Sequence, residues 1–147
     1  MDKPRFVYVT YVATSPEKLW NALIDPKMTV QYWQHENVSD WKPGSRWEHR
    51  RSVAPATIDL VGKVVESVPP RRLVITWADP SDEARPEKHT RVTFEIEPVR
   101  GVARLTVTHE DLEPDSSMLR GITDGWPKVL SSLKSLLEAG RPLPTLW

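Results

Sequence analysis

A change of hydrophobic period along the chain constrains its fold more than any other feature. Between residues 46 and 110, apolar side chains recur at every second position, whereas near the C-terminus they recur every three or four residues. The alternation is cleanest in residues 90–97 and 102–110. Period-two alternation indicates antiparallel strands with one packed face and one wet face, and the longer period indicates an amphipathic helix. The pattern predicts an α+β fold in which an antiparallel sheet is followed by one long helix.

Six segments are predicted as strands: residues 6–12, 46–52, 58–68, 73–78, 90–97 and 102–110. Ser15-Pro16 and Asp25-Pro26 each combine an N-cap with a proline at the first helical position, so two short helices should follow the first strand. The predicted order is β-α-α-β-β-β-β-β-α. The final helix has one apolar stripe, formed by Leu119, Ile122, Trp126, Leu130, Leu133 and Leu137. Because Gly125 and Pro127 weaken its middle, we expect a kink there or a helix that starts near Trp126.

The length and composition indicate one domain over residues 1–147. A net charge of zero gives no attraction to nucleic acid or to an anionic membrane, and no apolar run is long enough for a signal peptide or a membrane span. The chain has no cysteine, which excludes disulfides and thiolate metal sites and favours a reducing, cytoplasmic setting. The proline-containing tail, residues 141–147, cannot continue the helix, but we expect partial docking through Leu143, Leu146 and Trp147.

The predicted dimensions of the sheet and the helix leave a gap between them. Six strands at about 4.8 Å spacing form a sheet roughly 24 Å wide, whereas one helix with its side chains is about 10–12 Å across. Either the sheet curls tightly onto the helix and packs solid, or a space remains. A space lined by tryptophan and aliphatic side chains is where an apolar ligand binds. Periodicity alone leaves both alternatives open.

A set of short motifs extends over nearly the whole chain. They are SPEKLW at 15–20, DP at 25–26, YW at 32–33, GKVVE at 62–66, PPRRLVITW at 69–77, VTFEIEP at 92–98, LTVTHE at 105–110 and GW at 125–126. Together they resemble the activator of heat-shock protein 90 ATPase homologue-like family, within the START-like (SRPBCC) helix-grip superfamily. The resemblance implies a curved six-stranded sheet wrapped on the C-terminal helix, with a hydrophobic pocket between them. KPGSR at 42–46 and Pro127 depart from the family pattern.

Eight residues are candidates for binding a ligand in this pocket. By register and helix stripe, Trp77 and Trp126 should lie on opposite walls, with Trp33 and Trp47 nearer the mouth. His109 shares the inward parity of its strand, which makes it the first choice for a polar contact with the ligand. The alternatives are that the tryptophans are ordinary core and that the histidines turn to solvent. The candidates are Trp33, Trp47, His49, Trp77, His109, Met118, Ile122 and Trp126.

Two classes of function remain open at this point. No enzyme motif, metal-ligand spacing or cofactor fingerprint is present, although pocket-shaping catalysis needs none. Glu66 is expected to pair with Arg71 or Arg72, and the arginine pairs stand isolated among acids, which argues against a nucleic-acid face. The first class is a module that binds a small hydrophobic or aromatic molecule. The second is a protein-interaction module resembling the chaperone-activating domain, for which a solid core and an exposed apolar patch would be evidence. Because the eukaryotic activators carry an additional N-terminal domain, we expect this protein alone not to stimulate a heat-shock protein 90 ATPase.

Overall fold

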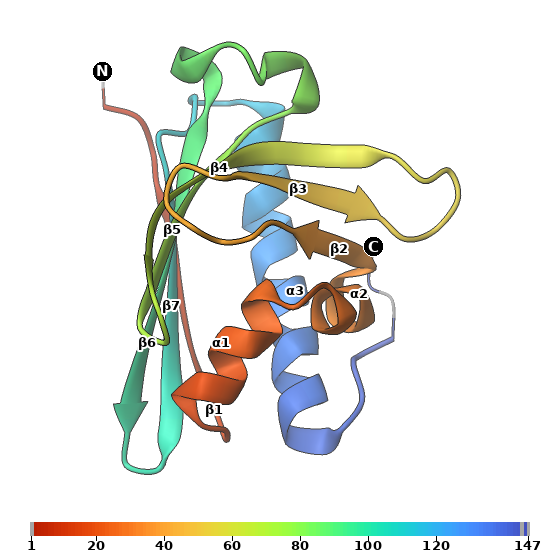
Figure 1. Ribbon diagram of the computed structural model, residues 1–147. Coiled ribbons are helices and arrows are strands. Elements are labelled where there is room, and N and C mark those ends of the chain that lie inside the picture. Colours follow the sequence, from red (N-terminus) through yellow and green to blue (C-terminus); the bar gives the residue numbers. More distant parts are fainter. Residues whose placement is uncertain (1, 145, 147) are drawn as a thin grey trace.

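The structure is a computed structural model that describes residues 2–144 and 146. Figure 1 shows how the sheet and the helices are arranged. Two short 3-10 turns, Pro80–Asp82 and Pro86–Lys88, lie in the loop of residues 78–89. The elements in chain order are β1 (Phe6–Val12), α1 (Pro16–Ile24), α2 (Pro26–Trp33), β2 (His35–Val38), β3 (Arg46–Arg51), β4 (Ile58–Val68), β5 (Arg72–Trp77), β6 (Thr90–Val99), β7 (Val102–Glu110) and α3 (Ser117–Ala139).

The sheet has seven strands in the order β1-β7-β6-β5-β4-β3-β2, and all neighbours are antiparallel. The α+β prediction is confirmed, but the expected count of six strands is one too low. The additional strand is β2, which has four residues and pairs with β3 at the edge of the sheet. Its sequence, HENV, has no alternating apolar pattern. It is extended because α2 ends at Gln34 in a left-handed conformation, which turns the chain back alongside β3.

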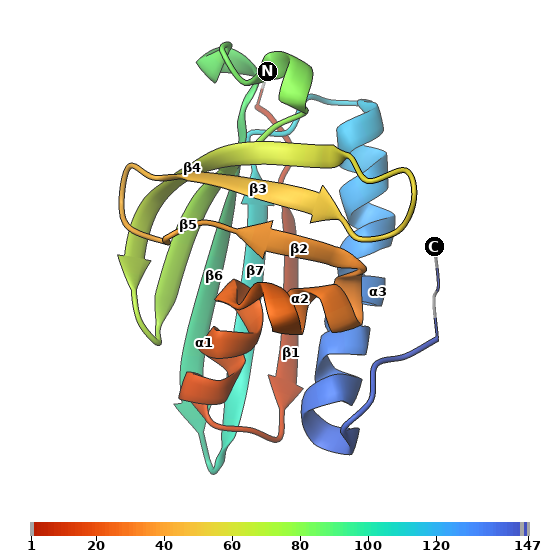
Figure 2. The ribbon, with the colours of Figure 1, turned by 45° about the vertical axis from the view of Figure 1, so that its right-hand side comes forward.

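The sheet is strongly curled. Figure 2 shows β2 and β3 crossing in front of β5, β6, β7 and β1, with β4 bending from one direction to the other. Gly62 lies in β4, where a side chain would overlap the carbonyl oxygen of Thr76 in β5 and the indole of Trp47 in β3. The Nε1–H of Trp47 donates a hydrogen bond to the same Thr76 oxygen at 2.7 Å. This close contact requires glycine at position 62.

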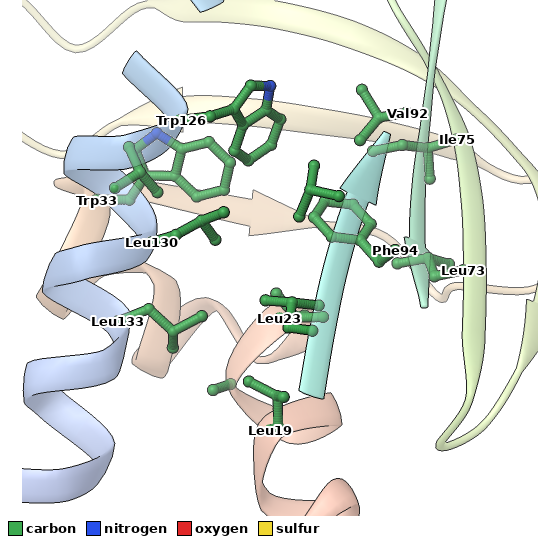
Figure 3. Packing of buried hydrophobic residues seen from close by; sticks show 14 of the residues in the cluster. Leu19, Leu23, Trp33, Leu73, Ile75, Val92, Phe94, Trp126, Leu130 and Leu133 are labelled. Carbon is green, nitrogen blue, oxygen red and sulfur yellow. The ribbon is translucent and has the colours of Figure 1, made fainter. Parts of the chain in front are cut away.

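The core lies on the concave face of the sheet. Helix α1 packs against β6 and β7, whereas α3 packs against β1 and α2. Figure 3 shows Leu19 of α1, Leu130 and Leu133 of α3, and Phe94 of β6 pointing toward this common interior. The alternation in residues 90–97 and 102–110 predicts that five apolar side chains point inward, and all five are buried in one cluster, which confirms this register: Val92, Phe94, Ile96, Leu105 and Val107.

Helix α3 is continuous over 23 residues and includes Pro127, so a helix that starts near Trp126 is wrong. It begins instead at Ser117, with the Oγ of Ser116 accepting from the backbone N–H of Leu119. It ends at Ala139, and Gly140, whose φ is 79°, is the C-cap. A proline inside a helix costs about 3 kcal/mol. The apolar stripe of α3 is buried on both sides of Pro127 and its burial offsets that cost, because one buried Leu or Ile side chain contributes about 1.5–3 kcal/mol.

The start of the C-terminal tail contacts α3. The backbone N–H of Leu143 donates to Ser132 Oγ at 3.2 Å, and Ser135 Oγ donates to the carbonyl of Arg141 at 2.7 Å. Leu143 and Leu146 remain substantially exposed, and the expected docking of Trp147 lies outside the described residues. Within the described ranges, none of the helices combines the length and the apolar character needed to cross a bilayer.

Candidate ligand-binding cavity

A cavity of about 320 Å³ lies between the first half of α3 and the curled part of the sheet. The second half of α3 packs solid, since Leu130 and Leu133 are fully buried in the core. Both alternatives left open by the periodicity are therefore realised, each at one end of the helix. The lining is mostly apolar and comprises Trp33, His49, Leu60, Trp77, Ser117, Met118, Gly121, Ile122, Gly125, Trp126 and Val129.

Aromatic rings from four different elements form one wall of the cavity. The ring centroid of Trp126 lies 5.4 Å from those of Trp33 and Trp77, which are 6.1 Å apart. The ring of Trp33 also lies 4.7 Å from that of His49. Trp77 and Trp126 are thus in contact, which corrects the expectation that they stand on opposite walls. Tilted and edge-on contacts of this kind are favourable and hold the rings in fixed relative positions. The wall is preformed in the structure.

His49 lies at the cavity wall with one ring nitrogen engaged and the other free. Its Nδ1 is 2.5 Å from Asn37 Oδ1, and since an amide oxygen only accepts, Nδ1 carries the hydrogen. Its ring stacks on His35 at 3.9 Å. The two nitrogens of His35 face acceptors, the carbonyl of Trp33 at 2.9 Å and Asp59 Oδ2 at 2.8 Å. Burial and the neighbouring His35 lower the pKa of His49 well below its usual value, so His49 is neutral at pH 7.

His109 is fully buried and does not line the cavity. The Nε1–H of Trp126 donates to its Nδ1 at 3.1 Å, which places the ring hydrogen on Nε2. That Nε2–H donates to Thr90 Oγ1 at 2.8 Å, and the Thr90 hydroxyl donates in turn to the carbonyl of Trp77. Burial lowers the pKa of His109 to about 3. Because both ring nitrogens have partners, a ligand could bond to His109 only by displacing one of them.

The structure brings six of the eight sequence candidates together at the cavity. Trp47 and His109 are the two that stand behind it. Trp47 has no exposed surface, so it does not lie near the mouth as expected. Its position is fixed by the hydrogen bond over Gly62, which is a contact between strands that no sequence pattern shows. The candidates at the cavity are Trp33, His49, Trp77, Met118, Ile122 and Trp126.

Two glycines of α3 lie at the cavity where sequence reasoning saw only a weak point in the helix. Gly121 and Gly125 are one turn apart and line the cavity on the same face as Ile122. A Cβ atom built on either glycine meets nothing within 4 Å. Each glycine costs about 1 kcal/mol of helix stability relative to alanine, and no steric need accounts for it. What the two glycines provide is open space beside the helix at the cavity. In the sequence, the spacing of four residues between the two glycines, next to the apolar stripe, was the pattern that could have indicated their place at the cavity.

Two further expectations from the sequence concern polar side chains, namely metal ligands and the partner of Glu66. Among the residues that the structure describes, no group of three or more His, Cys, Asp or Glu side chains is placed to hold a metal ion. Glu66 pairs with an arginine as predicted, and its partner is the Nε of Arg72 at 3.1 Å. The pair lies on the outer side of the sheet. Arg72 also contacts Glu95 at 3.1 Å.

A curled antiparallel sheet that wraps on a long C-terminal helix, with a cavity between them, defines a START-like helix-grip protein. The chain belongs to the family described as Activator of Hsp90 ATPase homolog 1-like protein, whose family model matches residues 13–138. No curated protein sequence matches the chain at a significant level.

Solved structures with this fold cover nearly the whole chain. A protein from Mesorhizobium loti is 25% identical, with a TM-score of 0.75 over 91% of this chain and 96% of its own. The Aha1 dimer from Colwellia psychrerythraea is 22% identical, with a TM-score of 0.77 over 93% and 98%. An HSP90 activator from Plasmodium falciparum is 20% identical, with a TM-score of 0.73 over 90% and 95%. At these identities the last two likenesses establish the fold alone.

Proposed function

We propose that this protein binds a small hydrophobic or aromatic molecule in the cavity between the sheet and α3. The observation that carries the proposal is an aromatic cavity lined by two helix glycines that packing does not require. A solid core would instead favour alanine or larger residues at these helix positions, since they stabilise the helix. The open space is maintained at a cost in stability, which is the expected balance at a binding site.

The size of the cavity sets the scale of the ligand. An apolar protein cavity of about 150 Å³ holds benzene, and the cavity here is about 320 Å³. A molecule of about two rings is therefore the right size. Burying about 200 Å² of apolar ligand surface contributes roughly 5 kcal/mol, and association entropy opposes a large share of it. Generic probes should bind with micromolar or weaker affinity.

The test uses a substitution that fills the open space beside the two glycines. In a helix, a leucine side chain points toward the N-terminus, so leucine at position 125 would lie over Gly121 and Met118. We expect Gly125→Leu to weaken binding of 2-methoxynaphthalene at least about tenfold, measured by equilibrium dialysis and by tryptophan emission. The variant should remain folded, because leucine is the better helix former.

The matched control is Thr123→Leu, which adds a leucine to an exposed position of the same helix that does not line the cavity. This variant should bind the probe as the unmodified protein does. Equal binding to all three proteins would place the probe elsewhere and refute the proposal. Ile122→Trp, which fills the cavity from the helix side, should lose binding together with Gly125→Leu.

Protein interaction is a second candidate function, and one surface feature favours it. Edge strand β1 presents Val7, Val9 and Tyr11 on the outer side of the sheet, and each is close to half exposed. Exposed apolar side chains on an edge strand are a possible docking strip. We nevertheless expect the protein alone not to stimulate a heat-shock protein 90 ATPase in a steady-state assay at micromolar concentration. A several-fold stimulation, lost in Val9→Lys, would favour the interaction function instead.

A further inference from the structure

The cavity wall is mostly apolar, and His49 and Trp77 meet within it. Their ring centroids are 5.9 Å apart, and both residues are almost fully buried. The Nε2 of His49 has no hydrogen-bond partner among the described residues, and it is not enclosed by protein atoms. Trp77 Nε1 is the one buried side-chain nitrogen or oxygen without a partner in the described part of the chain. Two adjacent residues at the cavity therefore each carry an unsatisfied polar atom.

The hydrogen-bonding roles of these two atoms are fixed. Because Nδ1 of His49 donates to Asn37 Oδ1, its Nε2 presents a lone pair and accepts. An indole nitrogen only donates. Buried polar groups are nearly always paired, and an unpaired one is a cost that a bound group can remove. Trp77 Nε1 is enclosed by protein atoms, so His49 Nε2 is the atom of the two that is open to a ligand, and a hydroxyl or N–H hydrogen complements its lone pair.

The surroundings of His49 select against an anionic ligand. The ring stacked on His49 is that of His35, and its Nε2 is already contacted by the Asp59 carboxylate at 2.8 Å. A carboxylate has no hydrogen to donate and would place its charge against the lone pair of Nε2. Burial disfavours protonation of His49, which would otherwise convert this nitrogen into a donor.

We infer that the cavity takes a neutral aromatic molecule that donates a hydroxyl or N–H hydrogen to Nε2 of His49. This inference rests on the proposed function and specifies its ligand. It moves the polar contact from His109, whose nitrogens are both engaged, to His49, which has one nitrogen free. Phenols and hydroxylated bicyclic compounds are the class that fits.

The test compares probes of one shape. 2-Naphthol donates a hydrogen bond, 2-methoxynaphthalene has the same rings but donates none, and 2-naphthoate is an anion. We expect the preference for 2-naphthol over 2-methoxynaphthalene to be about five- to tenfold greater in the unmodified protein than in His49→Leu. The affinity for 2-methoxynaphthalene should be the same in both proteins, and 2-naphthoate should bind most weakly to the unmodified protein. Equilibrium dialysis at pH 7 measures all three.

A second measurement needs no variant and covers the case in which His49→Leu does not fold. The ¹⁵N resonance of His49 Nε2 should move when 2-naphthol binds and stay nearly unchanged with 2-methoxynaphthalene. His49→Gln, whose amide oxygen also accepts, should retain part of the preference.

The outcomes separate this inference from the proposed function. In one outcome, Gly125→Leu weakens the binding of both neutral probes while His49→Leu leaves their relative affinities unchanged and 2-naphthol does not move the ¹⁵N resonance of His49. That result overturns the inference, and the binding function stands. Tightest binding of 2-naphthoate, increasing as the pH falls, would also overturn it, because His49 would then act as a protonated donor. If neither probe is sensitive to Gly125→Leu, the binding function itself fails.

Discussion

Replacing Gly62 with alanine is expected to destabilise the protein by about 4 kcal/mol or more. The new methyl group would occupy the space of the Thr76 carbonyl oxygen and of the Trp47 indole. Relief requires Trp47 to leave its fully buried site and lose its hydrogen bond to Thr76, and displacing a buried tryptophan costs about 3–5 kcal/mol. Since small domains are stable by only about 5–15 kcal/mol, most of the folding free energy would be lost. Urea unfolding followed by circular dichroism measures the change.

The matched control is the same substitution in a different environment. Gly121→Ala adds a methyl group that meets nothing within 4 Å, in a regular helix. It should raise the free energy of unfolding by about 1 kcal/mol through helix propensity. A Gly62→Ala protein as stable as the unmodified one would show that β4 and β5 do not approach as closely as described.

Acid should destabilise the protein well before most of its carboxylates are protonated. The pKa of His109 is lowered by burial to about 3 from 6.5, so the unfolded chain takes up a proton that the folded chain excludes. The stability is complete above pH 6.5 and is lost as the pH falls toward 3. Between pH 7 and pH 5, this histidine alone removes about 2 kcal/mol. His49, whose pKa is also lowered, adds a loss of the same sign.

Urea unfolding at pH 7 and pH 5 measures this loss, and His109→Gln isolates the part due to His109. A glutamine amide offers one acceptor and one donor, for Trp126 Nε1–H and Thr90 Oγ1, and it does not titrate in this range. The variant should lose about 2 kcal/mol less than the unmodified protein between the two pH values. Identical pH dependence of the two proteins would mean that His109 is accessible and titrates normally when folded.

Both predictions concern contacts that hold the cavity wall in place. The chain Trp126–His109–Thr90–Trp77 joins α3 to three strands through hydrogen bonds behind the aromatic rings. Gly62 and Trp47 hold β3 against β4 and β5. Acid or the Gly62→Ala methyl group should therefore weaken ligand binding and stability together, whereas Gly125→Leu should weaken binding without lowering stability.

The amino-acid sequence by itself determined the layers of this protein. The alternation in residues 90–97 and 102–110 predicted which side chains are buried, and the stripe from Leu119 to Leu137 predicted which helix face they meet. Both signals succeed because side-chain direction along a strand or a helix is set by local backbone geometry. The caps at Ser15 and Asp25 are local too, and both form as the sequence predicts.

Only the tertiary structure decided where the cavity lies and which polar atom it offers. The edge strand β2, with its sequence HENV, is held by pairing with β3, and α3 continues through Pro127 because its stripe is buried on either side. Parity placed His49 and His109 alike on the inner face, yet their partners differ, since Asn37 reaches one nitrogen of His49 while Trp126 and Thr90 engage both of His109. These outcomes depend on how far the sheet curls over α3, and that curl arises from contacts between segments distant in the chain, such as Gly62 with Thr76 and Trp47.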